Sequence, residues 1–316
     1  MSLYTKEHLR QLSTTFKREQ RKLNWQKLKN NKGLLIGGTI FFILVLLALI
    51  GPILTTSDPY EMKVTNRLLG PSSTNWFGTD EFGRDLFTRI VYGARVSLFV
   101  GVVVATVSSL FGLVIGLYAS YYVWLDHILM RICDGLVAIP GILLAIALMS
   151  ALGASATNVI ISLVIVFTPN IARVVRSSAL VIKEQTYIEA MLAQGASNTR
   201  ILWLHIMPNT LSPLLVQATF IFAEAIISEA ALSFLGAGIP APEPSWGNIL
   251  QAGKLVIFKA WWMVVVPGSF IVIAVLSLNL FGDGLRDYLD PRMKAIPSKK
   301  RKNKKGGPSD VITASK

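Results

Sequence analysis

Apolar residues follow one another along this chain in long blocks that carry no charge. Four such blocks cover residues 33–54, 96–125, 135–172 and 260–282. A helix needs about 20 apolar residues to cross the hydrocarbon of a membrane, whereas a soluble core is built from short apolar runs separated by polar faces. The blocks therefore predict an all-α polytopic membrane protein.

The length of these blocks sets the number of crossings. The block at 135–172 is long enough for two spans, and its centre at 153–158 reads Gly-Ala-Ser-Ala-Thr-Asn, which favours a turn between them. Residues 211–239 are apolar except for Glu224 and Glu229 and predict a further span. With one span in each remaining block, we expect six transmembrane helices.

Basic residues are concentrated at the two ends of the chain. The 31 Lys and Arg outnumber the 18 Asp and Glu, and nine of them lie within residues 1–33 while ten follow Gly282. Cytoplasmic segments of membrane proteins are rich in Lys and Arg, so both termini are expected in the cytoplasm, which agrees with six crossings. Aromatic residues do not alternate with these charges as they do in single-strand binding grooves, so nucleic acid is not an expected partner.

The chain thus divides into one membrane domain and two polar tails. We expect a basic cytoplasmic tail at 1–32, a six-helix domain at 33–292 and a basic, disordered cytoplasmic tail at 293–316 that also suits anionic membrane lipid. The longest connections inside the membrane domain are an external loop at about 55–95 and a cytoplasmic loop at about 173–213.

Residues that catalysis or metal binding would require are scattered. Cys133 is the single cysteine, and His8, His127 and His205 are far apart along the chain. The sequence has neither a Gly-x-x-x-x-Gly-Lys-Ser/Thr phosphate loop nor a His-Glu-x-x-His zinc pair. We therefore expect a non-catalytic chain with no cofactor or metal site of its own.

The cytoplasmic loop is amphipathic and divides into two short helices. Its apolar side chains recur near helical spacing, at Ile188, Leu192, Ile201, Leu204 and Met207. We expect Thr186 to cap the first helix with Glu189 as its capping-box partner, and Gly195 to permit a sharp turn. Ser197 is expected to cap the second helix and Pro208 to end it.

This loop carries a recognisable motif. It contains the order Glu189-Ala190-x-x-x-x-Gly195, followed by an apolar run that ends in proline, and this order resembles the EAA loop of ABC-importer permeases. The resemblance implies a type I ABC importer permease fold with a cytoplasmic coupling helix. In that family the coupling helix docks into a groove of the ATPase subunit and converts nucleotide-driven closure into rocking of the transmembrane bundle.

The end of the motif narrows the resemblance to one subgroup. It reads His205-Ile-Met-Pro208-Asn209, which is similar to the peptide/nickel permeases of the second-subunit type, the dipeptide/oligopeptide permease C family. The resemblance implies an ATPase contact made by Glu189, Ala190, Gly195, Ser197, His205, Pro208 and Asn209. Met191 departs from the family, which usually has a second alanine there.

Further stretches resemble the same family over roughly residues 30–293. They lie at 76–85, 93–98, 229–238, 242–247 and 282–292. Their combination is more specific to the family than any one stretch.

Charged residues of the external loop form a second group of candidates. Asp80, Arg84 and Asp85 lie just before the second span, in a segment punctuated by Gly78 and Gly83. We expect them to pair with each other and hold the loop on the bundle, in preference to docking a solute-binding protein.

Two carboxylates lie inside the fifth span. An unpaired carboxylate is costly in lipid, so Glu224 and Glu229 are each expected to face the bundle interior or a wet cavity. Residues five positions apart lie about 140° apart around a helix, so the two cannot share one face. One would line the route while the other meets a neighbouring helix or the external surface.

Together with the resemblance, these features predict half of the translocation pathway of an ATP-binding-cassette importer for di- or oligopeptides, in the bacterial cell membrane. The expected partners are a second permease subunit in a heterodimer, two ATP-binding subunits that bind ATP and Mg, and a solute-binding protein outside.

Two alternatives stay open. A nickel or metal-chelate importer would have the same architecture, because cargo is selected mainly by the binding protein. A secondary transporter would be expected to carry ionisable groups in several spans and paired halves, whereas the charges within spans are confined here to the fifth.

Overall fold

The chain is a bundle of helices in a computed structural model that describes residues 15, 18–19, 25–55 and 57–289. The elements of this part are α2 (Lys32–Leu54), η1 (Val64–Asn66), α3 (Leu86–Tyr121), α4 (Val123–Val137), α5 (Gly141–Leu152), α6 (Ala156–Lys183), α7 (Thr186–Ala193), α8 (Asn198–Arg200), η2 (Ile201–Ile206), α9 (Met207–Phe234), α10 (Trp246–Leu255) and α11 (Trp262–Leu289). The expected tail at 293–316 lies outside the described residues, as does most of the tail at 1–32.

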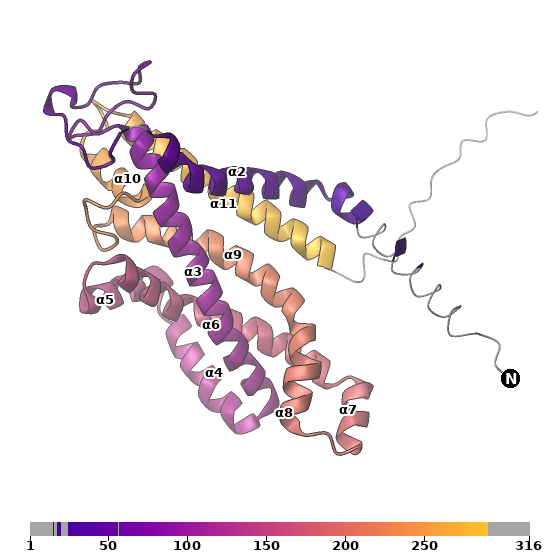
Figure 1. Cartoon of the computed structure of the whole chain (residues 1–316). Coiled ribbons are helices and arrows are strands. Elements are labelled where there is room, and N and C mark those ends of the chain that lie inside the picture. The colour runs from indigo at the N-terminus through magenta and orange to yellow at the C-terminus, as the bar shows by residue number, and fades with distance from the viewer. Residues whose placement is uncertain (1–14, 16–17, 20–24, 56, 290–316) are drawn as a thin grey trace, which may run out of the picture.

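The described helices confirm the all-α, six-span prediction. Five are long and apolar enough to cross a membrane: α2, α3, α6, α11 and the continuous rod Asn198–Phe234, which comprises α8, η2 and α9. A sixth span is obtained when α4 and α5, which are bent by 91° at their junction, are counted as one. Figure 1 shows this bend, together with α3 running through the middle of the bundle.

The third span differs from its prediction. A span starting near residue 135 was expected, but a helix already begins at Val123 and breaks at 138–140. Pro140 precedes α5, and its ring and missing N–H prevent a straight continuation of the helix. The turn predicted at 153–158 is present, with Gly153 at φ 88° and Ser155 capping α6 through the backbone N–H of Asn158.

Both long connections are shorter than expected, because charge ended the apolar runs without ending the helices. α3 begins at Leu86, not at residue 96, so the external segment covers only 57–85. α6 continues to Lys183, and its Arg173 and Arg176 pair with carboxylates of α4, Asp134 at 2.8 Å and Asp126 at 2.5 Å.

Small residues let the helices approach closely. An added Cβ at Gly112 or Gly116 of α3 would lie 2.6 Å from an atom of α6, and one at Gly101 would lie 2.6 Å from Phe222 of α9. Apolar side chains gain nothing by leaving apolar lipid, so close van der Waals contact at small residues stabilises such bundles.

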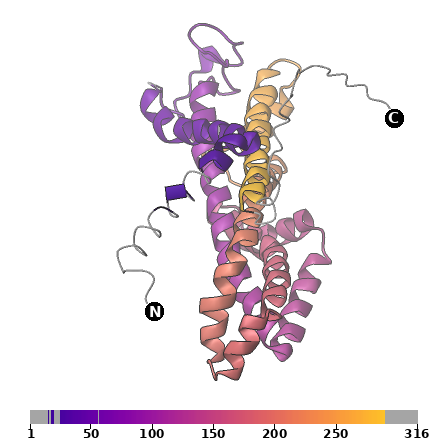
Figure 2. The same ribbon diagram turned by 90° about the vertical axis from the view of Figure 1, so that its right-hand side faces the viewer.

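The bundle has two distinct ends. Segment 57–85 and α10 gather at one, termed the loop end, and the hairpin of α7 and α8 lies at the other, termed the hairpin end (Figure 2). The start of α2 and the last turns of α11 meet away from the loop end, where Asn31 Nδ2 donates to the carbonyl of Gly284 at 2.8 Å. The first and last described helices of the membrane domain therefore begin and end on the same side of the bundle, as an even number of spans requires.

Gly37 at the α2–α11 contact should be intolerant of any side chain. Its added Cβ would lie 2.6 Å from backbone atoms of Phe281 and Ser277, so Gly37→Ala should force the helices apart at a cost of about 1–3 kcal/mol. We expect a lower apparent melting temperature of the purified, detergent-solubilised protein. Gly268→Ala is the matched control, because a Cβ there meets nothing within 4 Å; equal melting of the two variants would contradict the assignment.

Candidate functional site

The hairpin end is built around a glycine turn. α7 ends at Ala193, and Gly195 has φ 80° with open space where a Cβ would be. The N–H of Gly195 donates to the carbonyl of Leu192 and that of Ala196 to the carbonyl of Met191, each at 3.0 Å. These two bonds form a Schellman motif. Glycine is thus required here by its backbone conformation and not by crowding.

Three expected details of the hairpin are different in the structure. Thr186 is the first residue of α7, and the capping position belongs to Gln185, whose side chain makes no cap bond. Ser197 precedes α8 as expected, but its side chain makes no cap bond either. Pro208 does not end the second helix, since the helix continues through it: Pro208 follows the π-helical stretch Ile201–Ile206 and is the second residue of α9.

The second helix therefore continues directly into the fifth span. η2 is a π-helical stretch that joins α8 to α9 without a break. π-turns widen a helix locally and are frequent at functional sites. Consequently the hairpin and the fifth span share one helical rod, Asn198–Phe234.

Buried and polar contacts fix the hairpin to the bundle. Ile188 of α7 is 0% exposed and belongs to a core with Ile201 of η2 and Ala179 of α6. Tyr121 at the end of α3 donates from Oη to Asn198 Oδ1 at 2.8 Å. Because the hairpin is held by α3, α6 and α9 together, it should move with them as one body.

The outer side of the hairpin remains uncovered. Tyr187 and Leu192 of α7 and Leu204 of η2 are 43%, 46% and 63% exposed, and Glu189 and Ala190 are exposed beside them. Exposed apolar side chains beside a charged residue on a short helical hairpin suit docking into a groove of another protein.

The two halves of the predicted contact meet through a residue that the sequence did not single out. Asn209 Nδ2 donates to the carbonyl of His205 at 2.6 Å and lies 3.5 Å from Tyr187 Oη of α7. Pro208 is exposed next to them. Tyr187 directly precedes the Ile-Glu-Ala of the motif, and its exposure as an aromatic residue becomes visible only in the structure.

A buried carboxylate organises the loop end. Glu229 of α9 is 0% exposed and accepts hydrogen bonds from Ser97 Oγ of α3 at 2.9 Å and from Ser233 Oγ at 2.8 Å. The oxygens of these two hydroxyl groups also accept hydrogen bonds from the backbone. Ser97 Oγ accepts from the backbone N–H of Trp246 at 3.3 Å, and Ser233 Oγ from that of Ile239 at 3.1 Å.

This network, termed the Glu229 clamp (Glu229, Ser97, Ser233 and the N–H groups of Ile239 and Trp246), unites three of the family-like stretches. They are 93–98, 229–238 and 242–247. Sequence reasoning placed Glu229 in the interior but missed the serines, which are too common to be informative alone. The clamp holds the segment that enters α10 against α3 and α9.

Glu224 lies in a different environment. It is exposed on the surface of this chain, and no hydrogen bond or ion pair of its side chain occurs within residues 25–55 and 57–289. Glu224 therefore does not face the interior of this bundle, and the wet cavity is the alternative that stays a prediction for it. The two do occupy different faces of α9, as their spacing predicted.

The charged residues of the external segment form a buried lock. Arg84 Nε donates to Asp80 Oδ2 at 2.6 Å, and Arg89 Nε lies 3.5 Å from the same oxygen, with all three side chains nearly inaccessible. Asp80 also accepts from the backbone N–H groups of Phe82 and Arg84. A binding protein could not reach this pair without unfolding the segment.

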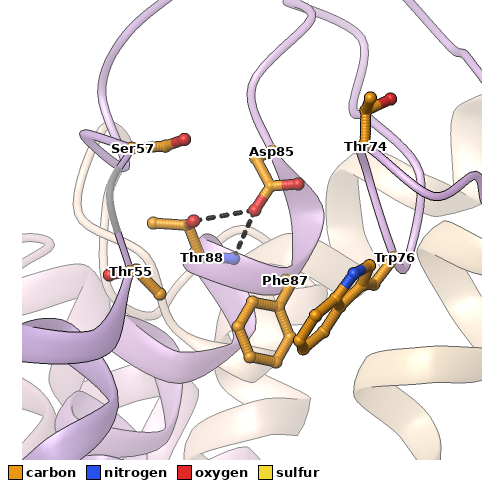
Figure 3. A pocket seen from close by; sticks show the side chains of 7 residues that line it. All are labelled: Thr55, Ser57, Thr74, Trp76, Asp85, Phe87 and Thr88. Atoms are coloured by element: carbon orange, nitrogen blue, oxygen red, sulfur yellow. Dashed lines mark hydrogen bonds between the residues drawn. The ribbon is translucent and has the colours of Figure 1, made fainter.

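Asp85 has a separate role. It caps α3 by accepting from the N–H of Thr88 at 2.8 Å and from its Oγ1 at 2.7 Å, and does not pair with Arg84 (Figure 3). It lines a pocket of about 230 Å³ at the loop end, beside the ring pair of Trp76 and Phe87. Trp76 is 65% exposed, so this pocket, and not the lock, offers an accessible surface.

Removing the clamp's carboxylate should release the segment before α10. In Glu229→Gln one serine faces an amide N–H₂ in place of an acceptor, which costs about 1–3 kcal/mol for a buried group. We expect roughly tenfold faster thiol labelling of a cysteine placed at Ile239, which is 3% exposed, in a Cys133→Ser background. Glu224→Gln on the same helix is the control and should leave labelling unchanged; an equal effect of the two variants would refute the clamp.

Removing the lock's acid should destabilise segment 57–85. Asp80→Asn leaves Arg84 and Arg89 buried without a carboxylate, at a cost of about 3–5 kcal/mol. We expect a lower melting temperature and faster proteolysis within 57–85. Glu61→Gln breaks only the exposed pair with Lys63 and should change stability by less than about 1 kcal/mol; similar losses in both variants would contradict the lock.

Two protein-family models match this chain. Residues 108–295 match the model of "Binding-protein-dependent transport system inner membrane component", and residues 20–71 match that of "N-terminal TM domain of oligopeptide transport permease C".

Individual proteins are similar over most of their length. The dipeptide transport system permease protein DppC of Alkalihalophilus pseudofirmus is 48% identical over 86% of this chain and 90% of its own. The protein of the same name from Bacillus subtilis is 40% identical over 85% of each chain. The di/tripeptide transport system permease protein DppC of Pseudomonas aeruginosa is 39% identical over 85% of this chain and 91% of its own.

A solved structure shares the fold. An inward-facing structure of the MetNI methionine ABC transporter superposes with a TM-score of 0.55 at 21% identity, covering 64% of this chain and 97% of that chain. At this identity the likeness shows the arrangement of helices alone.

Proposed function

This chain belongs to the family of binding-protein-dependent transport system inner membrane components, and from that membership we propose that it forms half of the membrane pathway of an ATP-driven importer of di- or oligopeptides. The relatives described above are named as dipeptide or di/tripeptide permeases, which supports a peptide cargo. None of them is named for nickel or a metal chelate. Membership of this family excludes the alternative that the chain is a secondary transporter.

The proposed importer divides the work among separate chains. A second permease subunit completes the pathway as a heterodimer, and two ATP-binding subunits bind ATP and Mg at the hairpin end. A solute-binding protein delivers peptide at the loop end. In this arrangement the hairpin end and both termini lie in the cytoplasm. Because the ATP-binding subunits are separate chains, this chain is a non-catalytic, multi-pass subunit of the cell membrane.

One observation carries the coupling role of the hairpin. The exposed apolar side chains of Tyr187, Leu192 and Leu204 belong to a hairpin whose second arm is part of the rod Asn198–Phe234. A displacement of the hairpin by an ATPase groove is therefore passed to the fifth span without an intervening hinge. The same hairpin contains the predicted contact residues Glu189, Ala190, Gly195 and Ser197. The first part of the rod contains the others, which are His205, Pro208 and Asn209.

The turn at Gly195 provides the test. A β-branched residue at φ 80° costs more than the roughly 1–2 kcal/mol of an ordinary residue in left-handed conformation, so Gly195→Val should reshape the hairpin. We expect the variant to reach the membrane normally, but to lose co-purification with the ATPase and about tenfold or more of ATP-driven peptide uptake.

Gly153→Val is the matched control. Gly153 has φ 88° and an equally open surrounding, but it lies in the turn between α5 and α6. It should retain ATPase co-purification. If Gly195→Val kept both the ATPase and peptide uptake, the hairpin would not be the ATPase contact.

A further inference from the structure

Two adjoining cavities on the surface of this chain differ in chemistry. The first, of about 360 Å³, lies between α3 and the segment before α10, and is lined by Tyr60, Tyr92, Arg95 and Glu243 among others. The second, of about 420 Å³, is almost wholly apolar and lies between α2, α3 and α9. Arg95 and Phe99 line both cavities, so the two adjoin at these side chains.

The first cavity is lined mainly by apolar groups, but it also holds two opposite charges without partners among the described residues. The side chains of Arg95 and Glu243 form no hydrogen bond or ion pair in the part of the chain that the structure describes. In contrast, Arg84 and Arg89 share Asp80. A cation and an anion left unsatisfied in one cavity are complementary to a molecule that carries both charges.

The first cavity lies at the depth expected for a lipid head group. Arg95 is the last charged residue before the charge-free stretch 96–125, so it marks the edge of the hydrocarbon. Tyr60 and Tyr92 accompany it, and tyrosine concentrates at the membrane–water interface. An arginine at this level can reach a lipid phosphate.

The apolar cavity continues from there toward the membrane centre. Along α3, Val102 lies two turns beyond Arg95, about 10 Å deeper. Phe41 and Val45 of α2 form the opposite wall. An acyl chain attached to the head group would fill this groove.

We propose that the two cavities together form a binding site for one phospholipid whose head group carries a phosphate and a primary ammonium. Arg95 binds the phosphate, Glu243 accepts from the ammonium, and one acyl chain lies along Phe41, Val45 and Val102. The site would fasten α2, α3 and the segment before α10 to the leaflet at the loop end. It is independent of what the importer carries.

Lipids that differ only in the head group test the proposal. The purified importer complex is stripped of lipid and titrated with phosphatidylethanolamine, phosphatidylcholine and phosphatidylglycerol of identical acyl chains, and bound lipid is counted by native mass spectrometry. We expect phosphatidylethanolamine to bind about tenfold more tightly than the other two, because one lacks N–H donors and the other lacks the cation.

Two variants separate the charges. Arg95→Gln should weaken phosphatidylethanolamine and phosphatidylglycerol alike by about tenfold, whereas Glu243→Gln should abolish only the preference for phosphatidylethanolamine. Neither side chain is bonded within the described chain, so both variants should fold. Glu61→Gln, another exposed carboxylate at the loop end, should bind as the unchanged protein does.

Three outcomes would overturn the assignment. They are equal binding of the three lipids, a preference that survives Glu243→Gln, or cross-linking of a residue placed at Arg95 to the second permease subunit in place of lipid. The last outcome would identify the cavity as a subunit contact.

Discussion

A carboxylate that no water reaches has to be hydrogen-bonded by its own protein, and this requirement shapes the loop end of the molecule. Glu229 meets it with Ser97 and Ser233, whose oxygens in turn accept the N–H groups of Trp246 and Ile239. The position of α10 therefore depends on a contact made within the helices. If the acid were removed, the two serines that receive the N–H groups of Trp246 and Ile239 would lose their common acceptor.

The same helix connects this clamp with the hairpin at the opposite end. Rod Asn198–Phe234 begins at the turn after Gly195 and carries Glu229 near its other end. In the proposed coupling, a displacement of the hairpin would act along one helix on the residue that holds the segment before α10 in place. The π-helical stretch Ile201–Ile206 interrupts the regular α-helical winding of this rod, and it lies beside the proposed ATPase contact.

Charges that are satisfied inside the chain can be told apart from charges that are not. Asp80, Arg84 and Arg89 are buried and mutually paired, so they stabilise the external segment and offer nothing to a partner. Glu224, Arg95 and Glu243 are exposed without partners among the described residues. In a membrane such groups need a complement from elsewhere, which is why the second subunit, the pathway or lipid is expected at their faces.

The sequence by itself determined the class of the protein, the number of spans when α4 and α5 are counted as one, and the turn at Gly195, because charge-free runs and a glycine turn are local properties of the chain. It misjudged where helices end. Arg95 and Arg173 end apolar runs, but α3 and α6 continue through both residues. A charge can therefore end a hydropathy run inside a helix, whether it is paired, as Arg173 is with Asp134, or without a partner among the described residues, as Arg95 is. The sequence also split one rod at Pro208. Only the tertiary structure decided which serines serve Glu229, since Ser97 lies 132 positions away, and which acids are buried, since burial depends on the helices that pack around them.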